Sequence, residues 1–591
     1  MATETAALAI GVIALVSTIE TCHRGYVRLI ATAAAMPSSS REFVLDLQIE
    51  HYRFDLYWQY MGKTETGTDI ALMREQPPPT QELIEGVASK ICALLRDSNH
   101  LAAEYGGAMP GTFDDLEEAQ GHTPGPASPR VESKILQQLE QLKQWRSQPP
   151  SAATSTASVP ISNMQKARWV WRDANRAQKL TADLKKYNDT LWTALSPVHA
   201  RLLKLAAPSF ILPGISDEAS LAMLDSERRG NLLDESLAAL SRLRRAVAHA
   251  LDQEDGRLAA SRMAIPPGDI QISTELTVTT GSRTKRAMGL LNGVAVLIEY
   301  REIDAELVHR VQDTLRRRLY QLAVVLSEPY HPSLRILPCL GVWSPDPAND
   351  RRYGLVFRVP TATSLAPVKF VTLAAMLSST PTAPRPPLGD RFKLALALSI
   401  AIMQLHAAGW YHKGIRPENI AFGQVAGAAA EVTEPRLLGF EFSRPATPAA
   451  ESLDGGAAAG VVDLYAHPAR QAQGPQRAPF RCTHDYYALG MCLLEIVLWE
   501  PLARVKERLY GVSPERPLRT ASEWAARVQE SVFAEMAGRY GEIYRDVILV
   551  CLSGKLPIQP RETPAGTDDP DAALHMAFFN DVIRRLAQCR A

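Results

Sequence analysis

Hydrophobic positions in residues 1–205 recur with the spacing of an α-helix rather than with the alternation of a β-strand. Leu45, Ile49 and Leu56, for example, lie four or seven residues apart and so fall on one helix face. The same spacing is found in residues 4–30, 41–61, 81–105 and 164–205. Because such helices bury their apolar faces against one another, we predict an all-α helical bundle over residues 1–205.

The first predicted helix begins with an apolar run, Ala6–Val16, that is hydrophobic on nearly all sides. One interpretation is a central bundle helix that the other helices surround. The alternative is a concealed membrane segment. It would insert obliquely or as one of several copies, because 11 residues are too few to span a bilayer. The residues that would enter lipid are Leu8, Ile10, Val12, Ile13, Leu15 and Val16.

The pattern changes beyond the bundle. Residues 206–265 contain further amphipathic helices, and residues 266–591 begin with strand-like segments that give way to a second helical region. We therefore expect a multidomain chain in which a helical connector joins the bundle to a C-terminal α+β domain with two lobes. Two interpretations of the connector stay open: it completes the bundle, or it acts as a brace that relays a signal between its neighbours.

A nine-residue motif, Tyr411–Asn419, has the outline of a protein-kinase catalytic loop, but Gly414 stands where the catalytic aspartate belongs. About 20 residues later, Gly439 stands where the metal-binding aspartate of a D-F-G segment belongs. The phosphate-binding lysine of the third strand is expected near Leu297 or Glu299, and neither residue can replace it. The sequence also lacks a glycine-rich phosphate loop before that strand.

The order of these segments resembles protein kinases, and an Asp485–Glu495 segment matches the kinase D-x-x-x-x-G-x-x-x-x-E helix. The resemblance implies a bilobal kinase-like fold over residues 266–591 that has lost its base, one metal ligand and its phosphate lysine. It therefore implies a pseudokinase with no catalytic residue, no cofactor and no enzymatic activity. His412 and Asp485 would be structural, and Asn419 is the one nucleotide-binding position that remains.

The N-terminal part resembles the HeLo domains, the prion-inhibition and propagation domains of filamentous fungi. The segments that carry this resemblance are Ala7–Leu15, Lys166–Asp173 and Leu184–Leu191. A helical bundle, a connector and a pseudokinase in this order are similar to the architecture of the mixed-lineage kinase domain-like family, which executes cell death at membranes. The resemblance implies that the bundle targets or perturbs membranes in a regulated cell-death or incompatibility response. It further implies conditional binding of membrane lipids, a protein partner or upstream receptor, and a homo-oligomer on activation.

Composition bears on the partners, the compartment and the metal sites that we expect. The formal net charge is zero, which argues against a nucleic-acid partner. The seven cysteines form no C-x-x-C pair and the 13 histidines show no ligand spacing, so we expect a reducing compartment and no metal site. We accordingly expect a cytoplasmic protein with conditional plasma-membrane association. Two alternatives remain: a soluble scaffold that binds partner proteins, and a residual nucleotide-binding atypical kinase that uses Asn419 and Glu441.

Overall fold

The structure is a computed structural model in which contacts divide the chain into two compact units, residues 1–203 and residues 204–591 without a short insert at 562–566. The structure describes residues 2–34, 40–62, 70–98, 174–226, 232–249, 262–276, 285–303, 309–345, 352–359, 368–379, 385–425, 429–446, 463–471, 478–510, 526–556 and 570–591, apart from a few single or paired residues within these ranges.

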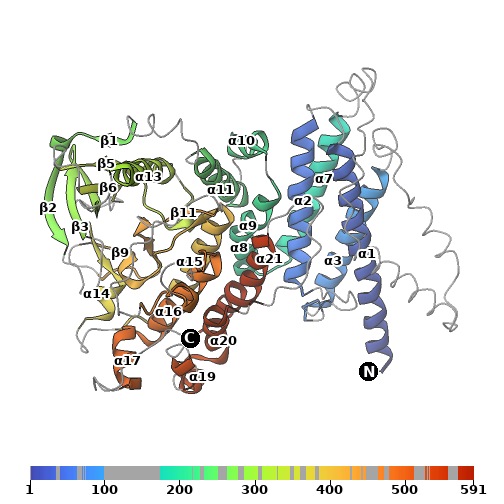
Figure 1. Ribbon diagram of the computed structural model, residues 1–591. Coiled ribbons are helices and arrows are strands. Elements are labelled where there is room, and N and C mark those ends of the chain that lie inside the picture. Colours follow the sequence, from blue (N-terminus) through green and yellow to red (C-terminus); the bar gives the residue numbers. More distant parts are fainter. Residues whose placement is uncertain are drawn as a thin grey trace. The chain divides into compact units, whose positions relative to one another are not determined.

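All the elements described in the first unit are helices, which confirms the prediction of a helical N-terminal region (Figure 1). Helix α1 packs against α2 and α3, and both of these contact α7. Large aromatic side chains fill the centre, and Trp58 and Trp192 are each only 1% exposed. The helices are α1 (Ala2–Ala34), α2 (Arg41–Tyr60), α3 (Pro78–Asp97), α7 (Ala174–Thr193) and α8 (Pro197–Ala206), the last of which crosses the unit boundary.

A buried ion network fixes α7 against α2. Arg53 forms an ion pair with Glu50 at 2.9 Å and a second one with Asp189. Asn188 donates to both the backbone carbonyl and the carboxylate of Glu50. Because a buried charge is tolerated only when it is paired and hydrogen-bonded, these contacts specify one register of α7 on α2.

The second unit begins with four short elements: α9 (Pro208–Ile211), the 3₁₀ turn η4 (Leu212–Gly214), α10 (Glu218–Ser226) and α11 (Leu232–His249). Ion pairs of Arg242 and Arg245 with Asp225 hold α11 to α10. Helix α11 also contacts α9 and α13. The helices predicted as a connector therefore contact the α+β part of the chain, through the packing of α11 on α13.

A six-stranded sheet follows, in the order β1-β5-β6-β4-β3-β2. All neighbours are antiparallel except β1 and β5. Helix α13 (His309–Ser327) connects β4 to β5 and packs on β5. The strands are β1 (Ala264–Ile265), β2 (Ile270–Leu276), β3 (Lys285–Leu291), β4 (Val294–Glu302), β5 (Cys339–Trp343) and β6 (Arg352–Arg358), and the 3₁₀ turns are η5 (Pro267–Asp269) and η6 (Pro332–Leu334).

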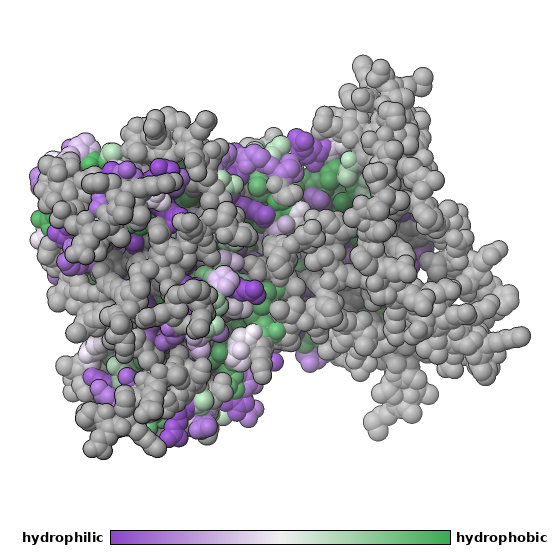
Figure 2. Space-filling model, viewed as in Figure 1, coloured by the Kyte–Doolittle hydropathy of each residue, from purple (hydrophilic) through white to green (hydrophobic). Residues whose placement is uncertain are grey.

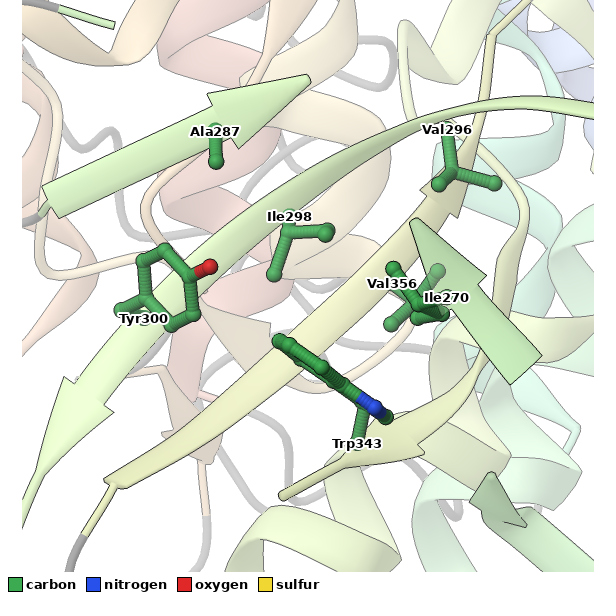
Figure 3. Close-up of a cluster of buried hydrophobic side chains, with 7 residues drawn as sticks. All are labelled: Ile270, Ala287, Val296, Ile298, Tyr300, Trp343 and Val356. Carbon is green, nitrogen blue, oxygen red and sulfur yellow. The ribbon is translucent and has the colours of Figure 1, made fainter. Parts of the chain in front are cut away.

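One face of this sheet buries a hydrophobic cluster around Trp343 (Figure 3). Val296, Ile298 and Tyr300 of β4 belong to that cluster. Successive side chains of a strand point to opposite faces. Leu297 and Glu299 therefore point to the other face of the sheet, toward the C-terminal loops described below.

The remaining elements form two small sheets and a helical region. Strands β10, β9 and β7 form one antiparallel sheet, and β8 pairs with β11. Helices α15 and α16 are the most buried and pack on each other. The α+β composition predicted for this region is confirmed. The elements are β7 (Val368–Thr372), α14 (Leu373–Leu377), α15 (Leu388–Ala407), β8 (Trp410–Tyr411), η7 (Pro417–Asn419), β9 (Ile420–Val425), β10 (Arg436–Leu437), β11 (Arg444–Pro445), η9 (Pro468–Arg470), α16 (Cys482–Leu498), α17 (Leu502–Tyr510), α19 (Phe533–Tyr540), α20 (Glu542–Ser553), α21 (Pro570–Phe578), the π-turn η11 (Phe579–Ile583) and α22 (Arg584–Leu586).

Hydrophilic and hydrophobic residues are interspersed over the described surface visible in Figure 2. A candidate site is therefore better sought in the buried polar contacts than in surface composition.

Candidate functional site

The loop between β8 and η7 is anchored by Asp485, in the first turn of α16. Its carboxylate accepts the backbone N–H groups of His412 and Lys413, each at 2.9 Å. It also contacts Nε2 of His406 at 3.0 Å. Asp485 is 1% exposed, and a carboxylate with several donors at a helix N-terminus is a strong anchor. These contacts fix the loop backbone to the helical region.

His412 is a buried, neutral residue of this loop. Its Nδ1 accepts the backbone N–H of Gly414 at 3.2 Å, so the ring proton resides on Nε2. The ring packs on Phe440, with 4.6 Å between centroids. Burial lowers the pKa of His412 to about 4, although the Asp485 carboxylate acts in the opposite direction. The residue supports the loop and is not placed to exchange protons near neutral pH.

We expect His412 to make the second unit less stable as the pH falls from 6.5 to 4. The unfolded chain binds the imidazole proton near pH 6.5 and the folded chain only near pH 4, so protonation favours unfolding. The full effect is about 3 kcal/mol, reached at pH 4 and below. Urea unfolding at a series of pH values, for the wild type and His412→Asn, measures it.

The comparison with His412→Asn cancels other groups that titrate in the same range. Burial raises the pKa of Glu495 to about 8, and that carboxyl therefore acts with the opposite sign, since it loses stability as the pH rises. The free-energy difference between the two proteins should shrink between pH 6.5 and 4. A difference that is constant over this range contradicts the assignment.

Gly414, Gly439 and Asn419 lie against one another. The side-chain amide of Asn419 donates to the carbonyl of Gly414 at 2.8 Å. A Cβ atom on Gly439 would lie 2.1 Å from that amide nitrogen, and Gly439 has a φ of 79°. A Cβ on Gly414 would lie 2.9 Å from the carbonyl oxygen of Gly439. The space that two aspartates would need is therefore closed by the backbone and by Asn419.

Arg286 and Glu299 complete this cluster from the sheet. They are cross-strand partners on β3 and β4, joined from Nε to Oε1 at 2.7 Å, with side chains 7% and 2% exposed. Arg286 also donates to Oδ1 of Asn419 at 2.6 Å and to the carbonyl of Glu418 at 2.7 Å. Glu299 accepts the backbone N–H of Gly439 at 3.0 Å. We name these four residues, Arg286, Glu299, Asn419 and Gly439, the junction network.

The polar groups that a nucleotide would require are already hydrogen-bonded within the junction network. Both ends of the Asn419 amide bond to protein, one to Arg286 and the other to Gly414. Of the two positions considered for the phosphate-binding lysine, Glu299 reaches the network, whereas Leu297 is buried and apolar. Glu441 lies outside the described residues. The charges present neutralise each other inside the protein instead of facing a ligand.

The structure describes only part of the proposed membrane segment. Leu15 and Val16 are buried, with 4% and 5% of their surfaces exposed. Leu8, Ile10, Val12 and Ile13 lie in α1, but their side chains are outside the described residues. None of the described helices is both long enough and apolar enough to cross a bilayer.

Sequence reasoning missed two sets of residues. Arg286 has no spacing relative to Asn419 that a motif could reveal, because 133 positions separate them. His23, His51 and Asp55 also come together between α1 and α2. Two of the three residues in the second set had a signal: His51 and Asp55 are four residues apart on one predicted helix, which places them on one face.

Comparison with known protein families gives a match to the N-terminal part of the chain. Residues 7–224 match the sequence model of the HeLo family, described as prion-inhibition and propagation. No curated protein matches the chain. The match supports the HeLo assignment and suggests a role related to cell death or incompatibility. It ends within α10, and so it extends past the first compact unit into the second.

Proposed function

We propose that this protein is a catalytically inactive, kinase-like signalling protein whose HeLo bundle acts on membranes in a regulated cell-death or incompatibility response. The observation that carries the proposal is the junction network, in which a buried Arg–Glu pair and Asn419 bond to one another and to the backbone of Gly414 and Gly439, where the aspartates are missing. It occurs in a chain whose N-terminal part matches the HeLo family.

The kinase-like part of the proposal is supported by the order of elements. A mainly antiparallel sheet carries a helix between its β4 and β5 strands, and a helical region follows. The segment Tyr411–Asn419 runs from the end of β8 to the start of β9, and Asp485 holds its backbone. Phosphoryl transfer depends on metal ligands and on charges positioned toward the nucleotide, whereas the side chains of Arg286, Glu299 and Asn419 bond to one another and to the backbone.

The membrane part of the proposal assigns the work to the apolar run Ala6–Val16. In the resting bundle, the run ends in the buried residues Leu15 and Val16, so lipid contact requires α1 to leave its neighbours. Several copies would then insert together, because one copy is too short to span a bilayer. A protein partner or upstream receptor, acting on the second unit, would control the departure of α1 from the bundle. The protein would then pass from a cytoplasmic resting state to the plasma membrane.

Dye release from anionic liposomes tests the proposed function. Residues 1–205 should release the dye and the full chain should not, because the second unit restrains the bundle. Residues 1–226, which include the whole HeLo match and α10, serve as a second fragment. If neither fragment releases dye from any lipid mixture, the membrane role is refuted and a soluble scaffold that binds partner proteins is favoured.

A further inference from the structure

We propose that His23, His51 and Asp55 form a binding site for a divalent transition-metal ion, Zn²⁺ in particular, between α1 and α2. His23 comes from α1, and His51 and Asp55 come from α2; they offer three ligand atoms that all lie within 4.8 Å of one another. No sequence motif and no part of the proposed function accounts for this cluster.

The distances among the three ligand atoms suit one small ion. Nδ1 of His23 lies 3.1 Å from Oδ1 of Asp55 and 3.0 Å from Nε2 of His51. Nε2 of His51 lies 3.4 Å from Oδ2 of Asp55. Zinc binds such atoms at about 2.0–2.1 Å, so tetrahedral ligands are separated by about 3.3 Å. Because the two histidine nitrogens lie near different oxygens of Asp55, its carboxylate would either turn to bring one oxygen to this separation from both nitrogens or bind the ion through both oxygens.

The chemistry of the donors agrees with the distances. Imidazole nitrogen and carboxylate oxygen are common zinc ligands, and three protein ligands with a free fourth position are typical of an open site that keeps a water. The side chains of His51 and Asp55 are 5% and 22% exposed, while that of His23 is 44% exposed. The exposed side of His23 gives an ion access to the cluster.

Neighbouring residues hold the ligands in place. His51 and Asp55 lie four residues apart on α2 and so share one face of that helix. The His51 ring stacks on the buried Tyr26 of α1, with 5.2 Å between centroids. Support of this kind around the ligands keeps a metal site in its binding geometry.

The consequence of metal binding rests on the proposed function. An ion held by His23 of α1 and by His51 and Asp55 of α2 ties the two helices together, only seven residues beyond the end of the apolar run at Val16. Bound Zn²⁺ would therefore oppose the departure of α1 from the bundle, and its removal would favour that departure.

Zinc titration of the full-length chain, after chelation and dialysis, tests the site. A chromophoric chelator as competitor gives affinity and stoichiometry, and Co²⁺ gives a visible absorption spectrum that reports tetrahedral ligation. We expect one Zn²⁺ per chain and an affinity at least tenfold weaker in His23→Ala and in Asp55→Asn. Both variants change partly exposed side chains, so they should fold. His199→Ala, in the same unit, is the matched control and should bind as the wild type does.

Thermal unfolding gives a second readout, because an ion that binds only the folded chain raises its melting temperature. Zn²⁺ should raise the melting temperature of the wild type and of His199→Ala, but not that of the two ligand variants. Substoichiometric zinc, or equal affinity in His23→Ala, Asp55→Asn and the wild type, overturns the proposal and leaves a hydrogen-bonded His–His–Asp cluster. Dye release does not enter this test, so a failed membrane role and a failed metal site are distinguishable.

Discussion

Arg286→Met is expected to lower the free energy of unfolding of the second unit by about 3–5 kcal/mol, because it leaves a buried carboxylate without its cation. Glu299 is 3% exposed, and the backbone N–H of Gly439 would be its main remaining donor in the junction network. Asn419 and the carbonyl of Glu418 would also lose the donor that Arg286 supplies. Calorimetry of the full chain measures the change in the affected transition.

The double variant Arg286→Met/Glu299→Leu should be less destabilised than the sum of its two single variants, since it leaves no unpaired charge in the interior. Arg508→Met is the matched control. Its ion pair with Glu500 lies near the surface, with side chains 52% and 23% exposed, and its loss should cost less than about 1 kcal/mol. If Arg286→Met and Arg508→Met have similar effects, the junction network does not hold the sheet to the loop.

The sequence was sufficient to predict the elements with strong periodicity. The apolar pattern placed helices at residues 4–30 and 41–61, and the structure has α1 at Ala2–Ala34 and α2 at Arg41–Tyr60. Hydrophobic spacing reports which face of an element is buried, and that local property is encoded in neighbouring positions. Agreement within four residues is what such a signal supports.

The junction network could not be predicted in the same way. Arg286 follows Lys285 on a short strand, and two adjacent cations predict side chains that are exposed to solvent. Its burial depends on a cross-strand partner and on a loop 133 positions away, and neither relation leaves a spacing in the sequence. The missing aspartates were visible at Gly414 and Gly439. The buried cation that bonds to Asn419 beside them becomes visible only when the sheet and the loop are brought together.

Ala14→Lys in the fragment of residues 1–205 is expected to reduce dye release from anionic liposomes on the order of a hundredfold, because a lysine at the centre of a bilayer costs about 2.5–3.5 kcal/mol per inserted copy. Ala14 lies within the apolar run but on the exposed face of α1, so the bundle should keep its fold. Leu15→Lys is less informative. Leu15 is 4% exposed, and a charge there would unfold the bundle and abolish release for a different reason.

Val27→Lys separates insertion of the apolar run from a general effect of charge. Val27 is 45% exposed on the same helix, beyond the run, and its replacement adds the same charge at a position that does not need to enter lipid. Circular dichroism should show folded fragments for both variants. Release by Ala14→Lys at the wild-type rate would mean that the run stays out of the membrane. Equal loss in both variants would mean that the added charge acts through binding to the lipid surface, and that insertion of α1 does not explain the release.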